Sequence, residues 1–281
     1  MKNKMVFQRA MLFTALGILC VMLLMCIWPS LFTKYGTKDI FAAWQSPSKK
    51  HILGTNDMGY DIFTELVYAA FSTLFTGIAS ASAAVAAGTI VGLLCGYANG
   101  WLKELLKLLT NIFLLLPTLP MGIVLSAFMG SGTKSIVITL SVLSWSSTAR
   151  IVRAKTETLI AQNFVKELKI LGISKPRILF FHILPNLSEV VFSRFISTVA
   201  SCILTETTLS FLGLGSPDKA TWGAMINFAY KRGGFMREAY AYYLAPGLMI
   251  ALCVSAFYLL NCYFVSKAGN VEIGEYTTYL D

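Results

Sequence analysis

The residues whose types and spacing could do chemistry gather in one polar stretch, residues 150–189. Within it, Phe164, Leu168 and Leu171 fall at i, i+4 and i+7, a spacing that predicts an apolar stripe along one face of a short helix. Gly172 follows, and glycine can end a helix in a left-handed conformation without steric cost. This pattern predicts a surface that docks onto another element. Its role would be mechanical and not catalytic.

A second short helix is predicted after this glycine. Ser174 is a good N-cap, Pro176 is tolerated in a first turn, and Pro185 interrupts the hydrogen-bond ladder. Lys166 and Lys169 project away from the apolar stripe. A connector lying on the membrane surface would explain the charges and the stripe equally well, but it leaves the glycine and the prolines unexplained. We therefore expect a helix, a sharp corner and a second helix.

Elsewhere the sequence offers no catalytic constellation. Residues 130–135 superficially resemble a phosphate loop, but that pattern needs glycine where the chain has Phe128 and Thr133, so we expect a turn between two spans. The two histidines, His51 and His182, fall on opposite sides of the membrane in the predicted topology and cannot share a metal ion. The six cysteines lack paired spacing and all fall within predicted spans: Cys20, Cys26, Cys95, Cys202, Cys253 and Cys262. We expect no enzymatic activity, no metal site and no cofactor in this chain.

Composition indicates a membrane protein. Hydrophobic residues make up 56% of the chain and charged residues 13%, with a mean hydropathy of +0.66. Soluble domains carry about 25% charged residues. The formal charge of +9 could suggest nucleic acid, but the lysines and arginines sit at membrane edges without the interleaved aromatic residues of a base-stacking surface. We expect anionic lipid to be the counter-charge and no nucleic-acid partner.

The distribution of charge predicts six transmembrane helices. A helix needs about 20 apolar residues to cross the hydrocarbon. Five stretches carry no charged residue and a sixth carries only Glu206: 10–28, 66–102, 108–133, 135–149, 239–266 and 195–217. The predicted fold class is therefore an all-α membrane protein. Small residues crowd the second span from Gly77 to Gly88, which predicts close helix packing.

Lysine and arginine positions orient the spans. Lys2, Lys4 and Arg9 precede the first span, and the 150–189 stretch is also rich in basic residues, which predicts that both lie in the cytoplasm. Six crossings then put the N- and C-termini on the cytoplasmic side. A cleaved signal peptide is the alternative for the first span, but the span is long for one and no small-x-small cleavage site follows. We expect an anchor helix.

Five ordered segments resemble binding-protein-dependent ABC importer permeases, and more specifically the second permease of the dipeptide, oligopeptide and nickel group. They are 51–61, 149–153, the cytoplasmic loop with Gly172 and Leu184-Pro185, 206–215 and 221–225. Where the family has Glu-Ala-Ala the chain has Lys166-Glu167-Leu168, and where it has Gly-Arg-Asp the chain has Gly59-Tyr60-Asp61. A lysine in place of a carboxylate inverts the charge that the loop offers to a partner.

The resemblance implies a type I ABC importer permease fold, a prokaryotic cell-membrane location and a passive transport subunit. A homologous second permease would complete a heterodimer, an external binding protein would deliver substrate, and two cytoplasmic ATPases would use ATP and Mg²⁺ to drive alternating access. Peptides rank first as substrate, and nickel or a metal chelate is the alternative; a membrane sensor and an ion-driven secondary transporter rank below both. The implied domains are an anchor helix and external segment (1–70), a permease domain (71–266) with the coupling loop (150–189), and a tail (267–281).

The resemblance also implies which residues couple the chain to the ATPases. Phe164, Leu168 and Leu171 would form the packing face, and Glu167 would be the polar contact. The complete docking element would comprise Phe164, Lys166, Glu167, Leu168, Lys169, Leu171 and Gly172.

Three further expectations concern the spans and the outer segments. Glu206, a carboxylate at membrane depth, would line the transport path or tether helices, paired for example with Arg194 or with the partner permease; we favour the tether. Residues 53–59 are expected to form a turn held by Asn and Asp side chains, and 61–68 a helix lying on the interface. Trp222 is expected to anchor at the membrane interface.

Overall fold

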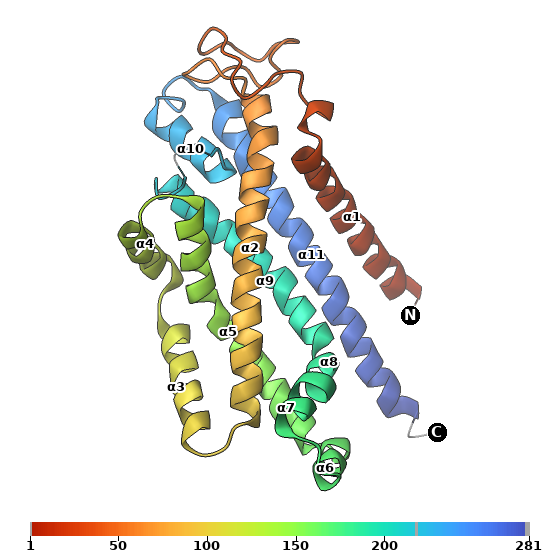
Figure 1. The fold of residues 1–281 in the computed structure, drawn as a ribbon. Coiled ribbons are helices and arrows are strands. Elements are labelled where there is room, and N and C mark those ends of the chain that lie inside the picture. The colour runs from red at the N-terminus through yellow and green to blue at the C-terminus, as the bar shows by residue number, and fades with distance from the viewer. Residues whose placement is uncertain (1, 217–218, 279–281) are drawn as a thin grey trace.

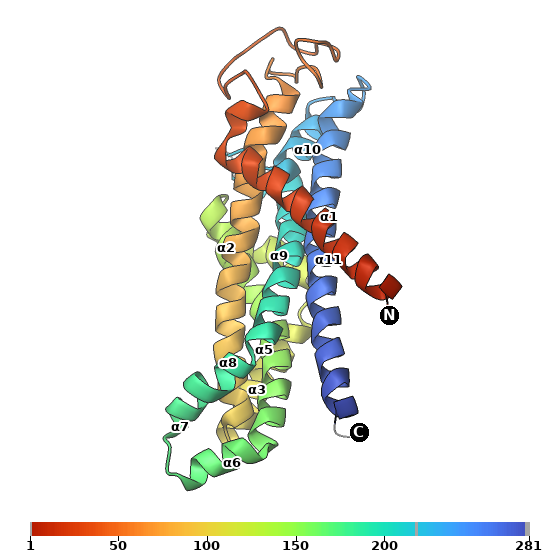
Figure 2. The same cartoon turned by 90° about the vertical axis from the view of Figure 1, so that its right-hand side faces the viewer.

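Apolar helices form one elongated all-α bundle (Figure 1). The computed structural model describes residues 2–216 and 219–278, with side chains described between residues 8 and 266. Five helices are long and apolar enough to span a membrane: α1 (Lys2–Ile27), α2 (Ile62–Tyr97), α5 (Thr133–Ala161), α9 (Ser188–Phe211) and α11 (Tyr240–Thr278). The long helices α2, α5, α9 and α11 follow the length of the molecule in both views (Figure 1, Figure 2). A bent pair of shorter helices raises the number to six, the number that the sequence predicted, when the pair is counted as one span.

The third span is broken into that bent pair. α3 (Trp101–Leu115) and α4 (Thr118–Met129) meet at 93°, whereas the sequence predicted one uninterrupted span over 108–133. Leu116 is extended, with ψ 127°, because the ring of Pro117 disfavours the helical conformation in the residue before it. Gly130 and Gly132, with φ of 82° and 151°, then turn the chain into α5, which confirms the turn predicted there.

Glycines allow α2 and α5 to approach closely. Gly88, Gly92 and Gly96 recur every fourth residue of α2 and therefore share one face. A Cβ atom added at Gly92 would lie 2.7 Å from the carbonyl oxygen of Ala149, and one at Gly96 would lie 2.7 Å from Cβ of Thr156. The close packing predicted for the second span is confirmed, and its main partner is the fourth span.

Residues 28–61 fold over one end of the bundle, the end that also carries α10 (Trp222–Lys231). They include the short helix η1 (Pro29–Leu31). Asn56 Oδ1 accepts hydrogen bonds from the N–H groups of Met58 and Tyr60, both at 2.9 Å, which confirms the predicted turn. Asp61 caps α2 by accepting from the N–H of Thr64 at 2.8 Å. The helix predicted on the interface over 61–68 is therefore wrong, because these residues form the first turns of α2.

Trp222 fastens α10 to α2. The side chain is fully buried. Its Nε1 donates to the carbonyl oxygen of Leu66 at 3.0 Å, and its backbone N–H donates to Thr73 Oγ1 at 3.1 Å. The predicted interfacial anchoring is wrong for this residue, because both of its donors are used inside the protein.

The opposite end of the bundle carries the polar loop (Figure 1). α5 continues past the predicted 135–149 span to Ala161 and brings the chain to α6 (Asn163–Ile170). α7 (Lys175–Arg177), the π-helix η2 (Ile178–Ile183) and α8 (Leu184–Asn186) then lead into α9. A separate apolar cluster lies beneath this loop, and its buried members are Leu93, Val152, Leu159, Val165, Ile178, Leu179, Ile183 and Leu187.

Candidate functional site

α6 ends in the sharp corner that the sequence predicted. Gly172 has a φ of 71°, which is the left-handed conformation expected of it. Its N–H donates to the carbonyl of Lys169 at 3.1 Å, and the N–H of Ile173 donates to the carbonyl of Leu168 at 3.1 Å. This pair of bonds is a Schellman turn, which satisfies carbonyls that a helix end leaves free. The corner therefore has one defined geometry.

The predicted packing face of α6 is partly covered by the protein itself. Val165 is fully buried, and Phe164 and Leu168 pack partly buried against the cluster beneath the loop. Phe164 and Leu168 therefore contact this cluster with part of their surface, and their role with Leu171 as the packing face for a partner stays a prediction. The cluster at the end of α2 and α5 takes the apolar side of this helix, so α6 is held firmly against the bundle.

The outward apolar surface lies at the corner. Ile170 is 84% exposed and Leu171 is 74% exposed, and Leu171 lies just past the last residue of α6. Ile170 was not among the residues singled out for docking from the sequence. The signal available was the pair of large apolar residues directly before a helix-ending glycine, because adjacent helix positions cannot both face the same core. Phe181, in η2, adds a further ring that is 74% exposed.

The charged side chains of α6 differ in whether they already contact another side chain. Lys166 Nζ donates to Asn163 Oδ1 at 3.4 Å, and Lys169 Nζ lies 5.5 Å from the centre of the Tyr97 ring. Glu167 is exposed and forms no ion pair with any described residue. Its carboxylate remains available to a partner on the same surface as Ile170 and Leu171.

The chain after the corner is helical up to α9, as predicted. Ser174 stands at the N-cap of α7, but its side chain makes no capping hydrogen bond. Pro176 lies in the first turn of α7, where a proline is tolerated. The helix takes the wider π form before Pro185, and this proline falls in the first turn of α8, where the α form returns. The predicted interruption at Pro185 is thus a change of helix type.

Glu206 is fully buried on α9 and does not pair with Arg194. Both residues lie on α9, twelve positions apart, which separates them by about 18 Å along the helix axis. Ser210 Oγ donates to Glu206 Oε1 at 2.7 Å, and Arg194 donates to Ser147 Oγ on α5 at 2.9 Å. The tether suggested between the two is therefore wrong, and Arg194 instead links α9 to α5.

The described part of the chain contains no group of three or more His, Cys, Asp or Glu side chains that could hold a metal ion. His51 lies at the α10 end, where it bonds Asp61, and His182 lies in η2 at the α6 end. The site assembled at the corner of α6 is a docking surface. It can present a rigid apolar surface, with a free carboxylate beside it, to another protein.

These features define a multi-pass integral membrane protein with a docking loop at one end. Residues 88–269 match the binding-protein-dependent transport system inner membrane component family, and the chain belongs to that family. It is a transport permease of the plasma membrane. Transporters of this kind work with a binding protein and with ATPase subunits.

Several transport permeases are similar to this chain over most of its length. The oligopeptide transport system permease protein OppC of Bacillus subtilis is 35% identical over 211 residues, which cover 74% of this chain and 69% of the relative. The glutathione transport system permease protein GsiD of Pectobacterium atrosepticum is 31% identical over 91% of this chain and 85% of the relative. The dipeptide transport system permease protein DppC of Alkalihalophilus pseudofirmus is 32% identical over 77% and 71%.

Proposed function

We propose that this chain is the permease subunit of an ATP-driven peptide importer. The support is that the similar permeases are named for oligopeptides, glutathione and dipeptides, which are all peptides. Nickel or a metal chelate is the lesser candidate, because none of these names refers to a metal. The chain itself performs no ATP hydrolysis in this proposal; ATP and Mg²⁺ bind to partner subunits.

The observation that carries the proposal is the exposed pair Ile170 and Leu171 at a corner of fixed geometry. Large apolar side chains that cluster on a protein surface mark interaction sites. An interface of this kind has an apolar centre and a polar rim, and Glu167 and Lys166 supply such a rim on α6. The docked partner in this proposal is an ATPase, and force applied at the corner passes through the buried cluster to α2 and α5.

The assembly that this function needs has four kinds of component, this chain among them. A homologous second permease forms a heterodimer with this chain, two ATPases dock on the α6 end, and an external binding protein docks on the α10 end. The α6 end and both termini lie in the cytoplasm, as the basic residues of the loop indicate. Closure of the ATPases then tilts the helix bundles between inward-open and outward-open states.

The test compares Leu171→Asp with Ala161→Asp in the complex reconstituted with its partner permease, ATPases and binding protein. Ala161 is the matched control, because it is exposed on the same loop and the substitution introduces the same charge. We expect Leu171→Asp to lower binding-protein-stimulated ATP hydrolysis by at least about tenfold, the loss of roughly 1.4 kcal/mol at a central contact. Ala161→Asp should keep the native rate.

Equal rates for the native chain and Leu171→Asp would refute the assignment of the corner as the docking element. Leu168→Asp is a poorer probe, because Leu168 is partly buried against the cluster beneath the loop and its replacement would disturb that packing. Glu167→Ala complements the test by removing the free carboxylate while leaving that packing intact.

A further inference from the structure

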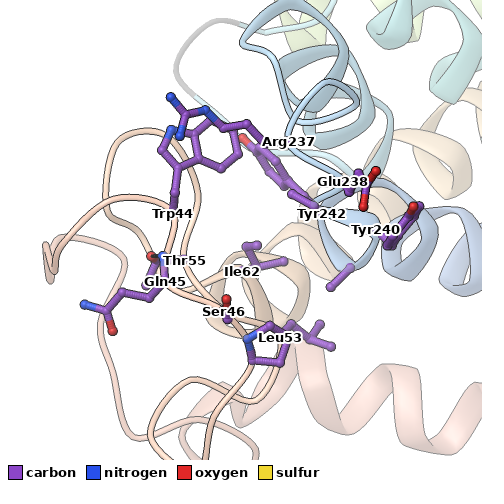
Figure 3. Close-up of a pocket in the computed structure, with 13 residues that line it drawn as sticks. Trp44, Gln45, Ser46, Leu53, Thr55, Ile62, Arg237, Glu238, Tyr240 and Tyr242 are labelled. Carbon is purple, nitrogen blue, oxygen red and sulfur yellow. Dashed lines mark hydrogen bonds between the residues drawn. The ribbon is translucent and has the colours of Figure 1, made fainter.

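A cavity of about 300 Å³ opens at the α10 end of the bundle, far from α6 (Figure 3). Two segments that are distant in the sequence form its walls, residues 44–55 and residues 237–242. Ile62, the first residue of α2, also lines it. Trp44 and Arg237 lie together on one side in Figure 3, and Glu238 lies on the opposite side from Gln45. The cavity is therefore built by tertiary contacts and not by one loop.

Both walls hold a residue in an unfavourable backbone conformation. Trp44 has a φ of 59° and Glu238 a φ of 55°, and these are the two non-glycine residues with positive φ in the described part of the chain. Such conformations cost energy and persist where the surroundings fix them, which happens most often at binding and catalytic sites. Here the backbone is fixed by hydrogen bonds from Trp44 N–H to the carbonyl of Asn56 at 3.1 Å and from Tyr240 N–H to the carbonyl of Glu238 at 2.8 Å.

Arg237 carries hydrogen-bond donors at the rim of this cavity, where its guanidinium lies beside Trp44 (Figure 3). Its guanidinium lies 5.2 Å from the centre of the Trp44 ring, so the ring orients it. Arg237 is exposed and forms no ion pair with any described residue. A guanidinium is planar and binds a carboxylate through two parallel N–H bonds. The geometry thus suits one carboxylate on the Trp44 side.

The surface around the cavity carries more basic than acidic side chains, although Glu238 in its lining is an exposed acid without an ion pair among the described residues. Asp57 pairs with Arg232 at 3.2 Å, Asp61 pairs with His51 at 2.9 Å, and Asp39 accepts from the N–H of Gly36 at 2.8 Å. Four exposed lysines of residues 28–61 form no ion pair with any described residue: Lys34, Lys38, Lys49 and Lys50. Such a field favours an acidic partner and speeds its approach.

We propose that this cavity is a docking socket that receives a carboxylate side chain of the importer's binding protein, with Arg237 as the residue that binds it. The inference rests on the proposed function, which places a binding protein on this end of the chain. Glu238, on the other side, repels a carboxylate that enters in the wrong orientation and so fixes the register of docking. The socket therefore specifies the binding protein and not the transported compound.

The test measures the dissociation constant of the importer's own binding protein for the complete complex in lipid nanodiscs. Arg237→Ala should weaken binding by at least about tenfold, since it removes one side of a charge-assisted contact. Lys49→Ala removes an exposed charge outside the cavity lining, and it should change the dissociation constant by less than about threefold. Arg237→Lys keeps the charge but loses the planar guanidinium that forms two parallel hydrogen bonds. Its effect on the dissociation constant should fall between the other two.

A second measurement locates the acid on the partner. Each exposed Asp and Glu of the binding protein is changed to Ala, and one of these changes should weaken binding to the native chain without weakening it further in Arg237→Ala. Equal losses from Arg237→Ala and Lys49→Ala would overturn the socket in favour of diffuse charge attraction. A labelled tripeptide that binds the complex in the absence of the binding protein, and loses this binding in Arg237→Ala, would show that the occupant is a peptide carboxylate.

The outcomes also separate this inference from the proposed function. Native complex that binds the binding protein and hydrolyses ATP on its addition supports the proposed function whatever Arg237→Ala does. Unchanged affinity in Arg237→Ala overturns the socket alone. Native complex that neither binds nor responds to the binding protein overturns both.

Discussion

At the scale of single residues, the buried Glu206 depends on one donor. Ser210 Oγ bonds its carboxylate at 2.7 Å, and Oε2 makes no hydrogen bond within the described part of the chain. We expect Ser210→Ala to lower the free energy of unfolding by about 1–3 kcal/mol, because it leaves a buried polar group without a partner. The measurement is the midpoint of thermal unfolding of the purified protein in detergent, followed by circular dichroism.

Ser201→Ala is the control for this prediction. Ser201 lies on the same helix but is exposed, and its hydroxyl bonds only the carbonyl of Ser197. Its replacement should change stability by less than about 0.5 kcal/mol. Equal effects of the two substitutions would show that the bond to Glu206 contributes nothing of its own.

Residues whose conformation is set locally could be predicted from the sequence, and residues whose direction depends on distant partners could not. Gly172 is left-handed as expected, because a helix end that turns sharply favours glycine whatever surrounds it. Leu168 is partly buried because it packs against a cluster that contains Leu93 and Val152, which lie far away in the sequence. A helical stripe shows which residues share a face but not what that face contacts.

At the scale of the elements, the α2–α5 contact depends on glycines. We expect Gly92→Ala to destabilise the protein by about 1–3 kcal/mol, because the added Cβ would lie 2.7 Å from the carbonyl oxygen of Ala149 and force the helices apart. Gly17→Ala makes the same change in α1, where no atom lies within 4 Å of the added Cβ. It should be neutral or stabilising by up to about 1 kcal/mol.

Thermal unfolding in detergent compares these two variants with the native protein. Similar shifts for Gly92→Ala and Gly17→Ala would contradict the close-packing account, because helix propensity would then explain both. A loss of stability confined to Gly92→Ala would show that the close contact between the second and fourth spans contributes this stability.

The broken span shows what a charge-based prediction omits. A stretch without charges indicates that a segment can lie in hydrocarbon, but it does not indicate whether that segment forms one continuous helix. Pro117 carried the missing signal, since the residue before a proline leaves the helical conformation. α4, with twelve residues, is too short to cross a membrane alone, so it forms a span only together with α3.

At the scale of the whole molecule, the number and order of the spans could be predicted because charge is excluded from hydrocarbon along the entire chain. Contacts at the polar ends of the bundle were harder to predict. Trp222 and Arg194 both use their donors on other helices, Leu66 of α2 and Ser147 of α5, which no local pattern reveals. The socket at Arg237 escaped prediction for the same reason, because its two walls meet only in the folded protein.

The central claim is that ATP hydrolysis on partner subunits drives peptide import and that the corner of α6 transmits the force from those subunits. The most direct measurement is accumulation of a labelled tripeptide in proteoliposomes that contain the complete complex, with the binding protein and ATP supplied on their respective sides. We predict accumulation with ATP, none with ADP, and a loss of at least about tenfold in Leu171→Asp but not in Ala161→Asp. Accumulation that follows an ion gradient without ATP, or that proceeds at the native rate in Leu171→Asp, would contradict the account.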